Sequence, residues 1–227
     1  MIQEKLNELN IDEIGDLHVA TSYDTPMRDD AFLLDDQAKI KLIEEYFGKI
    51  MHTLGLDLTD DSLSGTPNRV AKMYVKEIFK GLDPKNKPNA KVFDNKYQYG
   101  EMLIEKNITL YSSCEHHFLP IIGKAHVGYI AGDKVIGLSK INRIVDYFAR
   151  RPQVQERLSR QIFEELKSVL ETEDVAVVVE SKHLCVESRG IQDTESSTLT
   201  AEYGGKFKDR EVRKEFLAYV NQDYLAK

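Results

Sequence analysis

Apolar residues recur at helical spacing in two stretches of the first third of the chain. The first predicts a helix over about 36–54, and the second predicts a helix over about 67–80, with Pro67 suited to its first turn. Residues 1–34 are acidic and weakly patterned, so we expect a short helix near 2–14 and then an extended arm. The apolar stripes are Ile40, Ile43, Phe47, Ile50 and Leu54 in the first helix, and Val70, Met73, Tyr74 and Ile78 in the second.

The pattern changes to strands after residue 90. We predict strands over 91–99, 102–113, 118–130, 174–186 and 195–203, and helices over about 139–150, 153–170 and 209–222. Two helices, a mainly antiparallel sheet, two more helices, further strands and a closing helix indicate an α+β fold. We divide the chain into an N-terminal acidic arm (1–34), a helical region (35–90) and a sheet-containing catalytic region (91–227).

Composition narrows the class of protein. The 227 residues include 31 Lys and Arg against 38 Asp and Glu, a net charge of −7, which argues against a general nucleic-acid binder. No apolar run approaches the about 18 residues of a membrane span, and no secretory signal precedes the acidic start. The two cysteines are too few for a disulfide framework, so we expect a cytoplasmic protein whose cysteines are free thiols or metal ligands.

The charge is unevenly distributed along the chain. Residues 1–61 carry a net charge of −10, whereas residues 134–160 carry a net charge of +5. Within the basic stretch, Ser139, Lys140 and Arg143 fall at the start of a predicted helix, where free N–H groups favour a phosphate. A solvated helix face or an oligomer contact would explain the same charges. Two further sets of cations are candidates for anion contacts: Arg189, which follows the second cysteine, and Arg69 with Lys72, which follow the helix start at Thr66-Pro67.

Both cysteines lie beside histidines. Cys114-Glu115-His116-His117 and His183-Leu184-Cys185 contain three of the six histidines in the chain. Cys114 and His117 can converge only if the chain turns between them, so we place 114–117 at a strand end, and we expect His183 and Cys185 to share one face of a strand. Cys114, His117 and Cys185 then form a Cys₂His set that suits Zn²⁺ and leaves a fourth position open for catalysis.

Two other interpretations of these residues remain. Buried thiols and histidines can coexist without a metal, and the cysteines could form a disulfide, although a reducing compartment disfavours one. His18, His52 and His126 have no cysteine nearby, and for them we expect surface or core positions. The chain contains no phosphate-binding P-loop, no dinucleotide-binding glycine motif and no helical zinc-protease motif, so a bound nucleotide would need another kind of cradle.

Several segments, in order along the chain, resemble the GTP cyclohydrolase I family. The resemblance extends from about Ala38 to Leu217. It is carried by Thr66-Pro67-Asn68-Arg69-Val70-Ala71-Lys72-Met73, Cys114-Glu115-His116-His117-Phe118, Ile136-Gly137-Leu138-Ser139-Lys140-Ile141-Asn142-Arg143, Arg151-Pro152-Gln153-Val154-Gln155-Glu156-Arg157-Leu158, and His183-Leu184-Cys185 through Arg189-Gly190-Ile191.

This resemblance implies a tunnelling fold, in which an antiparallel sheet has helices packed on one face and an N-terminal helical region is added. In that family the sheets of five subunits close a barrel, two pentamers form a homodecamer, and active sites lie at subunit interfaces. The implied reaction converts GTP and water into 7,8-dihydroneopterin triphosphate and formate, the first step toward folates and other pterins.

The resemblance also implies roles for single residues. Cys114, His117 and Cys185 match the zinc ligands, and His116 and His183 match the acid/base histidines. Glu156, with Gln155, matches the guanine-recognition position, where a carboxylate can accept hydrogen bonds from the ring N–H and the amine. The matches to triphosphate contacts are Ser139, Lys140, Arg143 and Arg189, with Arg69 and Lys72 expected from a neighbouring subunit.

The expected mechanism begins with attack of water on C8 of the purine. Zinc lowers the pKa of bound water to about 7, and His183 is the candidate donor of a proton to N7, while His116 would assist ring opening or sugar rearrangement. Competing hypotheses are a pterin synthase or a queuosine-pathway reductase of the same fold, against which the Cys₂His set argues, and a non-enzymatic GTP-sensing oligomer.

Overall fold

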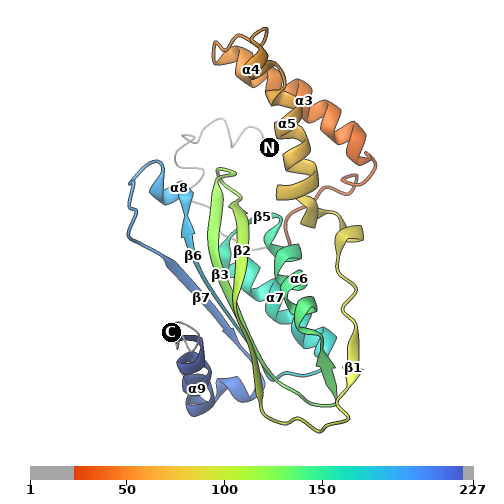
Figure 1. Cartoon of the computed structure of the whole chain (residues 1–227), viewed down its shortest axis with the longest axis vertical. Coiled ribbons are helices and arrows are strands. Elements are labelled where there is room, and N and C mark those ends of the chain that lie inside the picture. Colours follow the sequence, from red (N-terminus) through yellow and green to blue (C-terminus); the bar gives the residue numbers. More distant parts are fainter. Residues whose placement is uncertain (1–22, 222–227) are drawn as a thin grey trace, which may run out of the picture.

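The structure is a computed structural model that describes residues 23–221. The helix predicted near 2–14 lies outside the described residues. A helical hairpin projects from one end of an α+β body (Figure 1). The hairpin contains α3 (Asp36–Thr53), the short α4 (Asp61–Ser64) and α5 (Thr66–Met73). Asp35 caps α3 by accepting a hydrogen bond from the Ala38 N–H at 2.8 Å, whereas Gly65, not Thr66, precedes α5.

The second predicted helix differs from expectation at its end. Instead of continuing to residue 80, α5 passes into a π-helical turn (η1, Tyr74–Ile78), followed by two 3₁₀ turns, η2 (Lys80–Leu82) and η3 (Pro84–Asn86). This segment contacts the body at Gly81, which lies against the backbone at Tyr147. A Cβ at Gly81 would lie 2.0 Å from the backbone oxygen of Tyr147, so only glycine permits this approach.

A five-stranded sheet forms the centre of the body, in the order β5-β2-β3-β6-β7. The long strands are β2 (Met102–Cys114), β3 (Pro120–Ile130), β6 (Val175–His183) and β7 (Thr198–Tyr203), which pair with one another in antiparallel fashion. β5 (Pro152–Gln153) pairs in parallel with the end of β2, where the sequence predicted the start of a helix. The predicted strand over 91–99 is limited to β1 (Val92–Asp94), which pairs with β4 (Lys134–Ile136) in a separate two-stranded sheet.

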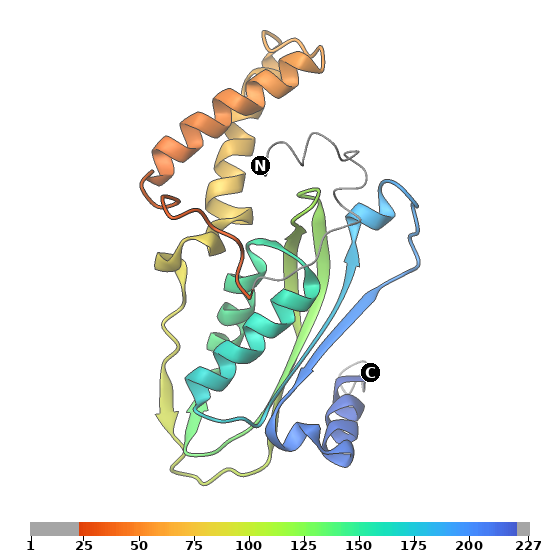
Figure 2. The ribbon, with the colours of Figure 1, turned by 180° about the vertical axis from the view of Figure 1, so that it is seen from behind.

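Helices α6 (Leu138–Ala149) and α7 (Gln155–Leu170) cover one face of the sheet, as predicted. Figure 2 shows them side by side in front of the strands. In β6, Val175, Val177 and Val179 point into this core. Ala176 and Val178 point to the other face, where α9 (Arg210–Asn221) packs through Phe216 after the 3₁₀ turn η4 (Gly205–Lys208). Because both faces of β6 are covered, its sequence is continuously apolar.

The stripe predicted for α3 is only partly covered. Ile40 is buried, but Ile50 and Leu54 remain 53% and 73% exposed, because α3 packs mainly against α5 along one side. None of the helices within residues 23–221 combines the length and apolarity that a membrane-spanning helix requires.

Candidate metal centre and substrate site

The segment from Cys114 to His117 turns away from strand β2, as the sequence predicted. Cys114 is the last residue of β2, and two backbone hydrogen bonds close the turn, from Phe118 N to Cys114 O and from Cys114 N to Leu119 O, both 2.8 Å long. Phe118 adopts a φ of +55°, which reverses the chain into β3. The turn directs Cys114 and His117 toward one point.

Cys185 reaches the same point from another element. β6 ends at His183, and Leu184–Glu187 form the helical turn α8, so the expectation that His183 and Cys185 share one strand face is wrong. The donor atoms of Cys114, His117 and Cys185 nevertheless all lie within 4.8 Å of one another. Two thiols and one imidazole at this spacing can surround a single tetrahedral cation with three ligands.

The electrostatics of the three groups fit a cation between them. Burial, together with the neighbouring Cys114 thiol, raises the pKa of Cys185 to about 11. Burial and the adjacent Arg189 guanidinium lower the pKa of His117, and Arg189 donates a hydrogen bond to His117 Nε2 at 2.8 Å. The lowered pKa favours the neutral imidazole that binds metals, and a metal at Nε2 would take the lone pair that now accepts from Arg189. A divalent cation would also stabilise the thiolates that two close thiols disfavour.

The two predicted acid/base histidines lie beside this cluster. His116 is exposed in the turn, and its Nδ1 lies 3.6 Å from the Cys114 Sγ. His183 ends β6, and burial lowers its pKa although the nearby Glu156 carboxylate opposes the shift. The structure therefore brings both histidines and the three predicted ligands to one end of the sheet.

Gln155 is buried and contacts His183, so it is not an exposed group. Its side chain is 1% exposed, and its Nε2 donates to the backbone oxygens of Val179 and Thr198 at 3.0 Å. These acceptors fix the orientation of the amide. Its Oε1 accepts from Ser181 Oγ at 2.6 Å and faces His183 Nε2 at 2.8 Å. A guanine contact by Gln155 stays a prediction, whereas its contact with His183 is part of the structure.

An ion pair that the sequence did not reveal connects α7 to the segment from Cys114 to His117, which we call the metal turn. Glu115, inside the turn, pairs with Arg157 in the first turns of α7 through contacts of 2.6 and 3.4 Å. The Arg157 side chain is buried at 4% exposure, and the Glu115 side chain is 15% exposed, so the pair is largely shielded from water. The residues are 42 positions apart, and no local pattern pairs them. The rings of Phe118 and Phe79, with centroids 5.0 Å apart, add a contact between the turn and the helical hairpin.

The candidate anion-binding residues do not all lie at this end. Arg189 contacts His117, and Glu156 is exposed in the first turn of α7. Ser139, Lys140 and Arg143 begin α6, which follows β4 and the Ile130 end of β3. That end pairs with Met102, the start of β2, whereas the metal turn follows the opposite end of β2 (Figure 1). Arg69 and Lys72 lie exposed on α5 in the helical hairpin.

Comparison with known proteins places these observations in a family. Residues 43–221 match the model of the family described as GTP cyclohydrolase I. A protein of Flavobacterium johnsoniae named GTP cyclohydrolase 1 is 62% identical over 217 residues, which cover 96% of this chain and 97% of that protein. Proteins of the same name from Citrobacter koseri (51% identical, 89% and 91% covered) and Aeromonas hydrophila subsp. hydrophila (53% identical, 88% and 91% covered) are also similar.

Proposed function

The chain belongs to the GTP cyclohydrolase I family, and we propose that Cys114, His117 and Cys185 are its catalytic metal ligands and that the metal is Zn²⁺. The enzyme converts GTP and water into 7,8-dihydroneopterin triphosphate and formate, by hydrolysis at C8, ring opening and rearrangement of the sugar. The observation that carries the metal assignment is the convergence of two thiols and one imidazole within 4.8 Å. Bound Zn²⁺ supplies hydroxide at neutral pH by lowering the pKa of a coordinated water to about 7.

His183 is the proposed proton donor to N7 of the purine. Its contact with Gln155 determines which imidazole nitrogen can transfer the proton. Because the amide orientation directs Oε1 toward His183 Nε2, that nitrogen carries a hydrogen and donates it to Gln155. Nδ1 is then the atom that can gain a proton and pass it to the substrate. His116, on the exposed side of the turn, assists ring opening or sugar rearrangement.

Glu156 and the cations hold the rest of the nucleotide. The Glu156 carboxylate can accept hydrogen bonds from the guanine ring N–H and exocyclic amine, a pairing that adenine does not offer. Arg189, already beside His117, contacts the triphosphate. Fixing both ends of the substrate holds C8 near the metal ligands, and such positioning contributes several kcal/mol to catalysis.

The remaining triphosphate contacts come from a second subunit in this proposal. Ser139, Lys140 and Arg143 lie at the other end of the sheet from Cys114, so a copy of the chain that aligns its α6 start with this metal turn completes the site. Exposed apolar residues of α3 support association, because water-exposed apolar patches favour contacts between proteins. They are Leu42, Tyr46, Ile50 and Leu54. The proposed assembly is a homodecamer, in which the sheets of each pentamer close a barrel.

One assay tests the function and the metal together. The purified protein is incubated with GTP, formate is measured, and the pterin product is oxidised to its fluorescent form while bound metal is quantified. We expect formate and pterin in equal amounts and about one Zn²⁺ per chain. Binding of GTP without formate would instead support a GTP-sensing oligomer.

A further inference from the structure

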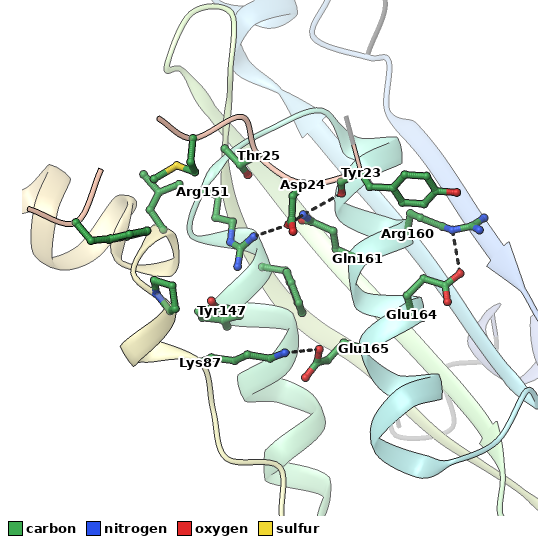
Figure 3. Close-up of a pocket in the computed structure, with 15 residues that line it drawn as sticks. Tyr23, Asp24, Thr25, Lys87, Tyr147, Arg151, Arg160, Gln161, Glu164 and Glu165 are labelled. Carbon is green, nitrogen blue, oxygen red and sulfur yellow. Dashed lines mark hydrogen bonds and ion pairs between the residues drawn. The ribbon is translucent and has the colours of Figure 1, made fainter. Parts of the chain in front are cut away.

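A cavity of about 580 Å³ lies on the outer side of α6 and α7, among residues to which the reaction gives no role. The segment Tyr23–Thr25 crosses its mouth, and one wall is apolar (Figure 3). The volume falls within the range of small-molecule sites, and a mostly apolar wall with few polar groups is typical of them. The apolar and aromatic lining residues are Met27, Phe32, Leu82, Pro84, Tyr147 and Phe148.

Arg151 is the buried cation of this cavity. It is 8% exposed, and its guanidinium lies over the rings of Tyr147 and Phe148, 4.6 and 4.8 Å from their centroids. Its Nε donates to the backbone oxygen of Gly81 at 2.8 Å, which fixes the plane of the guanidinium. A fixed, planar guanidinium against aromatic rings is suited to bind a carboxylate.

The other two cations of the cavity already have acidic partners on α7. Lys87 pairs with Glu165 at 2.7 Å, and Arg160 pairs with Glu164 at 3.1 Å. Arg151 has only the Asp24 carboxylate as its acidic partner among the described residues, at 3.3 Å, and the Asp24 side chain is 81% exposed. An exposed partner at this distance contributes little, so a ligand can replace it at a small cost in free energy.

Asp24 also shows that the Arg151 and Gln161 donors can bind a carboxylate. Its Oδ1 receives hydrogen bonds from Gln161 Nε2 at 2.6 Å and from Arg151, so the chain itself places a carboxylate between the two donors. Beside it, the Thr25 hydroxyl is buried and has no hydrogen-bond partner among the residues that the structure describes. Because this hydroxyl is not accessible from the cavity, recognition of a carboxylate rests on Arg151.

From this arrangement we propose that the cavity is a binding site for a small monocarboxylate with an apolar or aromatic body. The ligand carboxylate bonds Arg151 in competition with Asp24, and its body packs on Phe32, Leu82 and Tyr147. The site is separate from the metal cluster, since none of the ligands or acid/base residues lines it.

The test uses the metal-loaded enzyme and titration calorimetry with 3-phenylpropionate, together with its neutral isostere 3-phenylpropanamide. We expect the acid to bind and the amide to bind at least about tenfold more weakly, because it lacks the charge for Arg151. Asp24→Asn keeps an oxygen for Gln161 but removes the competing charge, so it should tighten binding of the acid by about twofold to fivefold. Arg151→Gln should abolish this binding.

Asp30→Asn is the matched control, because Asp30 belongs to the same segment, pairs with Arg28 at 3.2 Å and does not line the cavity. It should leave the affinity unchanged. Equal affinities for acid and amide, or the same affinity in wild type and Asp24→Asn, would overturn the proposal even if Arg151→Gln fails to fold. Formate release from GTP, measured on the same samples, reports the catalytic assignment separately.

Discussion

At one end of the five-stranded sheet, Cys114, His117 and Cys185 converge from a strand end, a turn and a helical turn. At the other end, Ser139, Lys140 and Arg143 lie in the first two turns of α6. The start of α6 follows the Ile130 end of β3, which is opposite the end of the sheet that holds Cys114. At the end with Cys114, which we call the metal end, the contacts Glu115–Arg157 and Gln155–His183 hold the turn and the His183 side chain in place. The first group is thus brought together within a single chain, whereas in the proposed assembly the second group serves the site of another subunit.

The most severe way to break the metal end is to remove a ligand. Cys114→Ser or Cys185→Ser should abolish zinc binding and turnover together, because a neutral hydroxyl does not replace a thiolate. Metal analysis and the formate assay on the same preparation measure this. Full zinc content with a normal rate in either variant would remove that cysteine from the ligand set. Lys140→Ala should lose turnover but keep its zinc, which separates the two ends.

Mixing variants tests whether the two ends belong to different subunits. Cys114→Ser and Lys140→Ala should each be inactive alone, but joint refolding or co-expression at equal amounts should restore about one quarter of the sites if each site uses one residue from each of two copies. Formate release by the mixture, compared with the separate variants, gives the result. No recovery in an assembled mixture would place Lys140 and Cys114 in one subunit's site.

Breaking the ion pair under the metal turn should have a large effect on stability. Arg157→Leu should lower the free energy of unfolding by about 3–5 kcal/mol, because the pair with Glu115 is buried. Chemical denaturation of the metal-loaded protein measures the loss. Lys134→Met is the matched change at the other end, where the pair with Asp94 is exposed, and it should leave the unfolding midpoint nearly unchanged. Equal losses in the two variants would show that the Glu115–Arg157 pair stabilises the fold no more than the exposed Lys134–Asp94 pair does.

Replacing Gln155 distinguishes positioning of His183 from contact with guanine. Gln155→Leu should lower kcat by about tenfold or more while the Kd for GTP changes little, since the proton-transfer geometry is lost. Gln155→Glu, which keeps an acceptor for His183, should recover part of the rate. Glu156→Ala should show the opposite pattern, with weaker GTP binding and unchanged zinc. A raised Kd for GTP with unchanged kcat in Gln155→Leu would favour guanine contact.

The smallest expected effect concerns His126, which lies in β3 away from both ends. It is 5% exposed, its Nδ1 accepts from the Asn107 N–H at 3.3 Å, and burial lowers its pKa below 6.5. The His126 imidazole is therefore protonated more readily in the unfolded chain than in the folded one. The stability that neutral His126 contributes is present above about pH 6.5 and is lost as the pH falls below that value. Thermal midpoints between pH 7.5 and 5.5 should fall less in His126→Asn than in wild type.

Much of the fold followed from local pattern. The apolar stripe of Ile141, Ile144 and Val145 predicted the helix that is α6, and the apolar run Val175–Val179 predicted the strand that is β6. Boundaries failed where a long-range contact outweighed local preference. Gln153 joins β2 as a strand instead of starting α7, and the 91–99 segment keeps only the three residues that β4 pairs. Neither pairing leaves a periodic signal in the sequence.

The candidate site divides in the same way. The sequence by itself determined the ligand types, because two cysteines beside histidines are residues that suit zinc, and the spacing of Cys114 and His117 required a turn. Only the tertiary structure decided that Cys185 arrives on a helical turn, that Arg157 pairs with Glu115, and that Gln155 lies buried against His183. The reason is physical: side-chain chemistry and local backbone geometry belong to neighbouring residues, whereas these contacts join segments that only the packing of the sheet and α7 brings together.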